Sequence, residues 1–384
     1  MARKLKSDKW LFTATLVLVC ASLVMVYSAS AMIAMERFHT STYFLFKQAT
    51  FALVGLVLMA VLMKIDYRRY RQPAVIWTAL AIAGLALVGV LAGPRINGAR
   101  RWFGVAGIGV QPSEFAKIAV IFFVAAILER RMDRIDELRY SMFPIAITLG
   151  VFVGLIMMQP DLGTALCIIV SVGTMIFAAG ISYRYILGLL LVSLPAASVV
   201  LMSADYRQRR MMVFLNPWQD PLGFGFQVIQ SLIAVGTGGV LGRGLMAGVQ
   251  KLFYLPYPET DFIYAVIGEE LGLAGATVIL ACFCVIAWRG LRTAMRAPDR
   301  FGALLALGLT TMISVQAFFN ISVVLGLLPT KGIPLPFVSF GGSSLIVSMI
   351  GMGILLNVSQ HASATHVVTT VMEPVPAPVA TADA

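Results

Sequence analysis

The chain has 384 residues, of which 59% are hydrophobic and only 12% are charged, and its mean hydropathy is +0.88. A water-soluble domain carries about 25% charged residues, so this composition excludes a soluble globular protein. It also excludes a disordered, collagen-like or coiled-coil chain. The composition predicts an integral membrane protein.

The net charge is +11, from 29 Lys and Arg against 18 Asp and Glu. These charges lie between apolar runs and form no single basic patch, which argues against nucleic acid as a partner. The four cysteines lie inside apolar runs without a CxxC pair, and the three histidines are too few and too peripheral for a metal cluster. No GxxxxGK[ST] sequence is present, which argues against an ATP-driven pump.

Ten apolar runs reach or approach the length of about 20 residues that one membrane crossing requires. The fifth and sixth are separated only by a Gln-Pro-Asp sequence, but together they would overfill one crossing and are therefore counted as two. The sequence thus predicts an all-α, polytopic membrane protein with about ten transmembrane helices. In chain order the runs are Trp10–Met35, Tyr43–Met63, Ala74–Gly93, Phe115–Leu128, Met142–Met158, Leu162–Gly180, Tyr185–Met202, Phe262–Trp288, Phe301–Leu325 and Gly341–Leu356.

The N-terminus and the segments after even-numbered runs carry 17 of the 29 cations. Because Lys and Arg favour the cytoplasmic side, both termini are predicted to be cytoplasmic. The first apolar run exceeds the h-region of a cleaved signal peptide and is expected to be an anchor. Residues 1–360 are predicted to form one transmembrane domain, and residues 361–384 a disordered cytoplasmic tail.

Most of the other cations lie in two loops on the opposite, outer side, at residues 94–112 and 203–261. The second is long, and structureless loops of more than about 15 residues are rarely idle. Its Gly-Thr-Gly-Gly sequence at 236–239 and Leu-Pro-Tyr-Pro sequence at 255–258 predict re-entrant or surface-lying elements. Lys and Arg normally favour cytoplasmic loops, so their presence in outer loops indicates an anionic partner on that side. The functional site is therefore expected at the outer face.

Asp261 lies where the long outer loop meets the eighth apolar run. A carboxylate at this water–lipid boundary is partly desolvated, so its pKa is expected to rise toward that of a general base. Alternatively, Thr260 or Asp261 caps the following helix. Both interpretations remain open, and they do not exclude each other.

Carboxylates inside the runs have two interpretations as well. Intramembrane carboxylates such as Glu269 and Glu270 are costly and functional by default, but the glycines around them favour tight packing in which Glu bonds to neighbouring backbone. Glu114 and Lys117 share a helix face and are expected to pair, as a structural ion pair or in a substrate cavity. Asp161 is expected to begin a helix, with a place in the cavity as the alternative.

The cations of the long loop include Arg243 and Lys251. They contact either anionic lipid head groups or a pyrophosphate, to which Arg offers a bidentate fork and Lys a point charge. The Gly-Gly-Ser-Ser sequence at 341–344 follows a segment broken by Gly and Pro at 332–336. Such backbone at the entrance of a span is tolerated where it lines a cavity.

Four stretches of the chain, in this order, form a recognisable pattern. They are Arg-Ile-Asn-Gly-Ala-Arg-Arg-Trp at 95–102, Gln-Pro-Ser-Glu-Phe-Ala-Lys at 111–117, Thr-Asp-Phe-Ile-Tyr-Ala at 260–265 with Gly-Glu-Glu-Leu-Gly at 268–272, and Pro-Thr-Lys-Gly at 329–332 with Ser-Phe-Gly-Gly-Ser-Ser at 339–344. These stretches resemble the SEDS family of bacterial cell-envelope proteins, which includes FtsW, RodA and SpoVE. The resemblance covers about Trp10 to Val358, and the Pro-Thr-Lys-Gly form at 329–332 is more similar to the division protein FtsW than to the elongation protein RodA.

The resemblance implies a peptidoglycan glycosyltransferase of the inner membrane that polymerises lipid II at the division septum and releases undecaprenyl pyrophosphate. Asp261 matches the family's essential Asp and is expected to deprotonate the acceptor hydroxyl. The leaving pyrophosphate requires positive charge from cationic residues or from a divalent cation, Mg²⁺ or Mn²⁺. The residues expected to bind substrate are Arg243, Lys251, Glu114, Lys117, Arg100, Arg101, Lys331, Ser343 and Ser344.

Two positions depart from the family pattern, Glu259 where His is frequent and Phe340 where Tyr is common. An acidic neighbour at 259 is expected to raise the Asp261 pKa further. The implied partners are a cognate class B penicillin-binding protein, other division proteins and membrane lipids, with no nucleic acid. Two other functions remain as alternatives: a lipid II flippase and a non-catalytic division scaffold.

Overall fold

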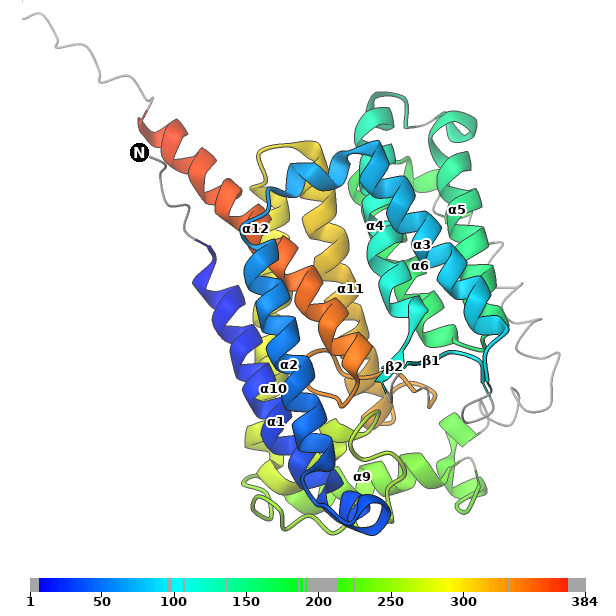
Figure 1. The fold of residues 1–384 in the computed structure, drawn as a ribbon, viewed down its shortest axis with the longest axis vertical. Helices are drawn as coiled ribbons and strands as arrows, with labels where there is room; N and C mark the ends of the chain where they lie inside the picture. The colour runs from blue at the N-terminus through cyan, green and yellow to red at the C-terminus, as the bar shows by residue number, and fades with distance from the viewer. Residues whose placement is uncertain are drawn as a thin grey trace, which may run out of the picture.

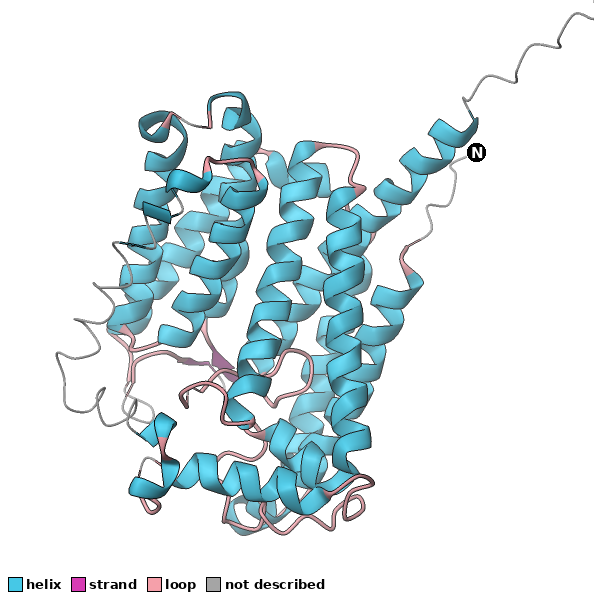
Figure 2. Cartoon of the chain, turned by 180° about the vertical axis from the view of Figure 1, so that it is seen from behind, coloured by secondary structure: helices cyan, strands magenta, loops and turns pink. Residues whose placement is uncertain are grey.

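The computed structural model describes residues 7–94, 99–105, 108–135, 137–185, 187–188, 191, 213–223, 225–330 and 332–371. Within them the chain is a bundle of α-helices with one short β-hairpin (Figures 1 and 2). Seven described helices are long and apolar enough to cross a membrane. These are α1 (Lys9–Phe38), α2 (Tyr43–Leu62), α3 (Pro73–Leu91), α5 (Leu138–Met158), α10 (Ile263–Met295), α11 (Arg300–Val324) and α12 (Gly342–Val371).

Two further helices of the bundle correspond to predicted apolar runs. The first, α4 (Pro112–Arg131), begins at a proline and therefore includes Ser113 and Glu114, and the second, α6 (Leu162–Ala178), has 17 residues. The seventh predicted run, Tyr185–Met202, lies largely outside the described residues. The all-α polytopic class is thus confirmed, while the number of ten crossings stays a prediction.

The outer helices are apolar on both faces. On α3, Leu80 and Leu87 are buried in the bundle, whereas Ile82 and Leu85 on the opposite side are 64% and 74% exposed. A helix that is hydrophobic all round is stable only in a protein core or among lipid chains. The exposed apolar faces therefore identify the surface that contacts lipid.

Three helices, α4, α11 and α12, form the centre of the bundle. They pack against one another, and almost all of α4 and of the described side chains of α12 are buried. This burial explains how α4 carries Glu114 and Lys117 inside an apolar bundle, because an ion pair at the centre never meets lipid. The central helices therefore hold the polar interior, and the other helices shield it.

The two ends of the bundle differ. One end holds the start of α1, the end of α12, the short helices η1 (Tyr67–Arg71) and η2 (Met132–Arg134) and the α10–α11 turn (Figure 1). The opposite end holds the antiparallel hairpin of β1 (Phe103–Val105) and β2 (Ile108–Val110), with η3 (Pro217–Gln219) and α9 (Phe226–Gly238). α9 lies across this end of the bundle (Figure 1), and whether it is re-entrant or lies on the membrane surface stays a prediction.

A kink divides α10. Gly272 has φ 65° and ψ −165°, so the helix breaks there although the apolar run continues. The loop at 239–244 satisfies the backbone groups that the kink frees: Leu273 N–H donates to Gly239 O at 2.9 Å, and Arg243 N–H donates to Glu269 O at 3.0 Å. The kink therefore fixes the outer loop to the first nine residues of α10.

The last helix extends beyond the expected boundary at residue 360. It continues to Val371, since no proline interrupts the chain before Pro374. Residues 372–384 lie outside the described part of the chain.

Candidate functional site

Asp261 lies in the turn before α10, beneath the segment that leads into α12. Asn320 of α11 donates from Nδ2 to the carbonyl oxygens of Asp261 and Ile333, each at 2.7 Å. A Cβ atom on Gly332 would lie 2.7 Å from Asp261 Oδ2, so only glycine leaves the carboxylate its present space. The segment around residue 332 therefore packs directly on the carboxylate.

The Asp261 carboxylate is not a helix cap. The N-cap residue of α10 is Phe262, and no side chain accepts a hydrogen bond from the first turn. The capping interpretation was therefore wrong. The carboxylate of Asp261 is left for another role.

Burial, together with the negative charges of Glu259 and Asp161, raises the pKa of Asp261 to about 7, while the positive charge of Arg101 acts in the opposite direction. Burial also raises the pKa of Glu259, whose Oε2 is buried without a hydrogen-bond partner. A carboxyl group with a pKa near 7 is half ionised at neutral pH and is suited to general-base catalysis. The expected effect of an acidic residue at 259 is present.

Arg101 is held beside the site by backbone oxygens. Its Nε donates to Gln159 O at 2.7 Å, and its Nη2 donates to Pro160 O at 2.6 Å. Next to them, Asp161 caps α6 by accepting a hydrogen bond from Thr164 N–H at 3.2 Å. The prediction that Asp161 begins a helix is confirmed, and its capping role fixes the turn that orients Arg101.

The two predicted serines join the start of α12 to other elements. Ser343 Oγ accepts a hydrogen bond from Gln111 N–H at 3.0 Å and donates to Gly109 O at 3.1 Å, which fixes the β-hairpin. Ser344 Oγ accepts from Gln316 Nε2 at 3.3 Å. Both hydroxyls therefore position the walls of the site in this state of the molecule.

Glu114 and Lys117 form the expected ion pair, with Nζ and Oε2 2.9 Å apart and both side chains 3% exposed. Lys117 also donates to Gln316 Oε1 at 2.6 Å, and Gln316 Nε2 donates to Pro334 O at 3.0 Å. The pair is thus connected through α11 to the segment that covers Asp261.

Lys251 and Glu270 form a second buried ion pair. Lys251 Nζ lies 2.5 Å from Glu270 Oε1 and donates to Ser28 Oγ of α1 at 2.8 Å, and the lysine side chain is 4% exposed. Arg243 lies 3.7 Å from Glu269 and is 39% exposed. The charge of Lys251 is therefore neutralised inside the protein, whereas Arg243 keeps part of its surface open.

The two glutamates of α10 also accept hydrogen bonds from the outer loop. Val249 N–H donates to Glu269 at 2.8 Å, and Met246 N–H donates to Glu270 at 3.0 Å. The expectation that these carboxylates bond to neighbouring backbone is confirmed. Together with the kink they hold the loop against α10.

Among the other predicted residues, Arg100 is exposed and donates to Leu91 O at 2.8 Å, and Lys331 lies outside the described residues. The sequence analysis missed Gln316 and Asn320, although an amide side chain inside an apolar run was a usable signal. Within the described ranges no three His, Cys, Asp or Glu residues are grouped so as to hold a metal ion.

The chain matches the family model described as cell cycle protein, FTSW_RODA_SPOVE, over residues 9–364. It is 45% identical over 351 residues to a probable peptidoglycan glycosyltransferase FtsW of Geobacter metallireducens, which covers 91% of this chain and 93% of the relative. It is 44% identical over 365 residues to the stage V sporulation protein E of Bacillus subtilis, covering 94% and 98% of the two chains.

Solved structures agree with the sequence relatives. A chain of the structure described as "Structural coordination of polymerization and crosslinking by a peptidoglycan synthase complex" superposes with a TM-score of 0.78 at 30% identity, covering 93% of this chain and 99% of that chain. The rod shape determining protein RodA of Thermus thermophilus superposes with a TM-score of 0.68 at 26% identity, covering 93% and 97%. The chain belongs to the FtsW/RodA/SpoVE family of cell cycle proteins.

Proposed function

We propose that this protein is a peptidoglycan glycosyltransferase that polymerises lipid II into β-1,4 glycan strands at the outer face of the bacterial inner membrane. The names of its relatives support this activity. The structural observation that carries the proposal is the Asp261 carboxyl group, whose pKa is raised to about 7 at the end of the bundle opposite the start of α1 and the end of α12.

In the proposed reaction, Asp261 removes the proton from the 4-hydroxyl of the acceptor N-acetylglucosamine. The resulting oxygen attacks the anomeric carbon of the donor N-acetylmuramic acid. The bond between this carbon and the undecaprenyl pyrophosphate oxygen breaks, and undecaprenyl pyrophosphate leaves. An α-linked donor that gives a β-linked product requires one inversion, so one base suffices. General-base catalysis supplies about 10²–10⁴-fold, and positioning of the two substrates must supply much of the rest.

The leaving pyrophosphate needs positive charge more than it needs a general acid. Arg101 is the cation that acts on the Asp261 pKa, which favours it for this role, with Arg100 and the partly exposed Arg243 as further candidates. A bound Mg²⁺ or Mn²⁺ would supply the same charge. The buried pairing of Lys251 with Glu270 favours a structural role for that lysine.

The test is lipid II polymerisation by the purified protein, comparing wild type with Asp261→Asn, with and without the cognate class B penicillin-binding protein. We expect long strands from wild type and at least 10²-fold less from the variant, since the base is lost. Equal polymer from both would remove Asp261 from the chemistry. No polymer from either, with the transpeptidase active, would favour the flippase or the scaffold.

The same proposal includes the setting of the reaction. The transpeptidase is proposed to bind the bundle and the outer loops, and the complex to act at the division septum with other division proteins. Similarity to a chain of a peptidoglycan synthase complex and to proteins named FtsW supports this. Residues 1–360 are proposed to form the catalytic domain, with both termini in the cytoplasm.

A further inference from the structure

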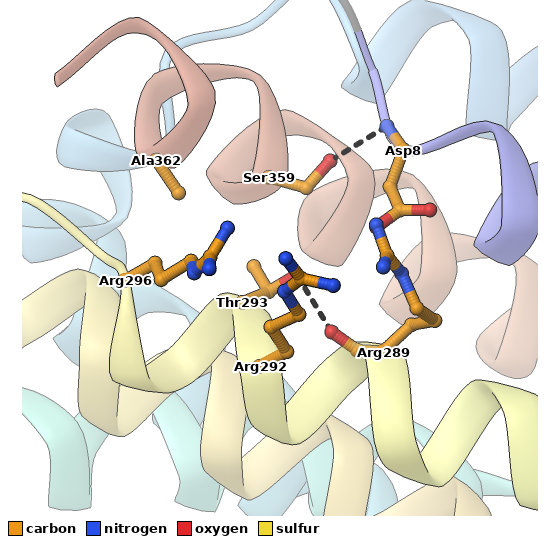
Figure 3. Close-up of a pocket in the computed structure, with 7 residues that line it drawn as sticks. All are labelled: Asp8, Arg289, Arg292, Thr293, Arg296, Ser359 and Ala362. Carbon is orange, nitrogen blue, oxygen red and sulfur yellow. Dashed lines mark hydrogen bonds and ion pairs between the residues drawn. The ribbon is translucent and has the colours of Figure 1, made fainter. Parts of the chain in front are cut away.

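A small cavity lies at the end of α10 that is opposite Asp261. It lies between the start of α1, the last turns of α10 and the C-terminal part of α12. Figure 3 shows the guanidinium groups of Arg292 and Arg296 directed from α10 toward α12. The residues that line the cavity are Asp8, Arg289, Arg292, Thr293, Arg296, Ser359 and Ala362.

The charges of this cavity are not balanced. Arg289 is paired with Asp8, with Nε donating to Oδ2 at 2.7 Å. For Arg292 and Arg296 no acidic side chain lies within ion-pair distance in the described part of the chain. Asp8 is the one acidic residue of the lining, so two guanidinium charges remain uncompensated there.

Neighbouring groups do not cancel this excess. The C-terminus of α10 and the N-terminus of α1 meet at the cavity, and their partial charges of about half a unit have opposite signs. The Thr293 hydroxyl donates a hydrogen bond to Arg289 O at 2.9 Å, and the Ser359 hydroxyl donates one to Leu356 O at 2.7 Å. The guanidinium groups are therefore the donors left to a ligand.

The cavity lies at the level of a membrane–water interface. Trp10 lies in the first turn of α1 and is 65% exposed, and Trp288 lies beside Arg289 on α10 and is 61% exposed. Exposed Trp side chains mark the head-group region of a bilayer. Met295, which is 80% exposed, continues the apolar face of α10 next to the cavity, so acyl chains can lie against the helix beneath a head group.

From the unpaired arginines, their place between helices and the interfacial tryptophans, we propose that this cavity binds the phosphate of one anionic phospholipid of the leaflet opposite the catalytic face. Basic pockets between transmembrane helices on the cytoplasmic side bind such head groups. Arg292 and Arg296 would each donate to the phosphate oxygens, as Arg does in phosphate recognition. The bound lipid would join α1, α10 and α12 at that end.

The test is native mass spectrometry of the purified full-length protein in detergent, titrated with phosphatidylglycerol or with phosphatidylcholine of the same acyl chains. We expect wild type to hold one phosphatidylglycerol more tightly than any phosphatidylcholine. The double variant Arg292→Gln/Arg296→Gln should bind it about 30-fold more weakly, which is two contacts of ~1 kcal/mol each.

The matched control is Lys64→Gln/Arg69→Gln, which removes two exposed cations, one just after α2 and one in η1, that do not line the cavity. It should bind phosphatidylglycerol as wild type does. Unchanged lipid affinity in the Arg292/Arg296 variant, or equal affinity of wild type for the two lipids, would overturn the proposal. Equal melting temperatures without lipid would show that the arginine variant is folded.

A last arm separates the two sources of phosphate. Inorganic phosphate at millimolar concentration should leave the bound phosphatidylglycerol in place, because it lacks the acyl chains that lie along α10. Displacement of the lipid by inorganic phosphate would instead identify a site for a soluble phosphate and would contradict the lipid assignment.

Discussion

The carboxyl pair of Glu259 and Asp261 gives the site its own pH dependence. A base must be deprotonated to act, so kcat/KM is expected to rise with pH and to level off above about 7, the pKa of Asp261. Replacing Glu259 with Gln removes the neighbouring negative charge, which lowers the Asp261 pKa. The acidic limb of the profile should therefore move to lower pH.

The measurement is the pH–rate profile of lipid II polymerisation for wild type and Glu259→Gln. The control is Glu36→Gln, which removes an exposed carboxylate of α1 that is not among the groups acting on the Asp261 pKa. An unmoved acidic limb in Glu259→Gln would show that another group controls the profile.

The raised pKa of Asp261 also affects folding. The pKa of Asp261 is 3.8 in the unfolded chain and about 7 in the folded protein, so the native state binds the proton more tightly. Between these two pH values, the free energy of unfolding therefore falls as pH rises. Asp261→Asn removes the penalty. The variant should melt at a higher temperature than wild type at pH 8, by about 2–4 °C per kcal/mol, with a smaller difference at pH 5. A variant that melts below wild type at pH 8 would contradict this.

The buried Lys251–Glu270 pair gives a prediction that separates structure from substrate binding. Lys251→Met leaves Glu270 buried without its partner and should destabilise the protein by about 3–5 kcal/mol. Adding Glu270→Gln should restore most of that loss. The measurement is thermal unfolding in detergent. The control is Arg243→Gln, which removes the partly exposed Arg243–Glu269 pair and should cost about 1 kcal/mol or less. A raised KM with unchanged stability in Lys251→Met would return the lysine to the substrate site.

At the residue scale, the sequence predicted contacts between neighbours better than contacts across the fold. The Glu114–Lys117 pair and the Asp161 cap follow from spacing, since both partners lie within one helical turn. The contact of Lys251 with Ser28 joins residues 223 positions apart, and no local pattern contains that information. The same limit applies to the packing of Gly332 on Asp261.

At the scale of elements, apolar length predicted where the helices lie but not where α10 bends. Its run continues through Gly272, and the bend depends on the loop at 239–244 that meets the freed backbone groups. Hydropathy treats that loop and α10 as unrelated segments. Glycine at 272 was visible in the sequence, but its positive φ was not.

The kink should depend on that glycine. Gly272→Ala places a side chain at φ 65° and brings its Cβ against the backbone of Val240 and Gly242, so it should lower stability by at least 1–2 kcal/mol and release the outer loop. The control is Gly150→Ala on α5, where a Cβ meets nothing within 4 Å and helix propensity favours Ala. Thermal unfolding and limited proteolysis of the loop would report both. An unchanged melting temperature in Gly272→Ala would contradict a rigid kink.

At the scale of the molecule, the cation distribution predicts which end of the bundle is cytoplasmic. In a variant without the four native cysteines, a single cysteine in place of Asp133 of η2, whose side chain is 86% exposed, should react with a membrane-impermeant maleimide only after the cells are opened. A single cysteine at Tyr254, which is 54% exposed in the outer loop, should react in intact cells. The reverse pattern would invert the proposed topology and place Asp261 on the cytoplasmic side.

Composition alone predicted the membrane class, because too few charges were present to cover a soluble surface. Composition did not predict that the bundle is arranged around α4, α11 and α12. The central helices α11 and α12 are less apolar than the peripheral helices α3 and α5, but this difference in hydropathy does not say which helices pack against one another. The amides at positions 316 and 320 of α11 were the local sign that this helix is central.

The length of α10 has a consequence for the depth at which the reaction takes place. A hydrocarbon core of about 30 Å is crossed by about 20 helical residues, and counting that far back from Trp288 arrives near Gly268. The segment before the kink, with Asp261 at its start, would then lie at the height of the lipid phosphates on the far leaflet. A prenyl-linked sugar keeps its pyrophosphate at this height, so each donor can enter sideways while the growing strand leaves into water. The thickness of the surrounding bilayer thus becomes a variable of catalysis, because a thicker membrane would draw the substrate's phosphates away from a carboxylate fixed to the protein.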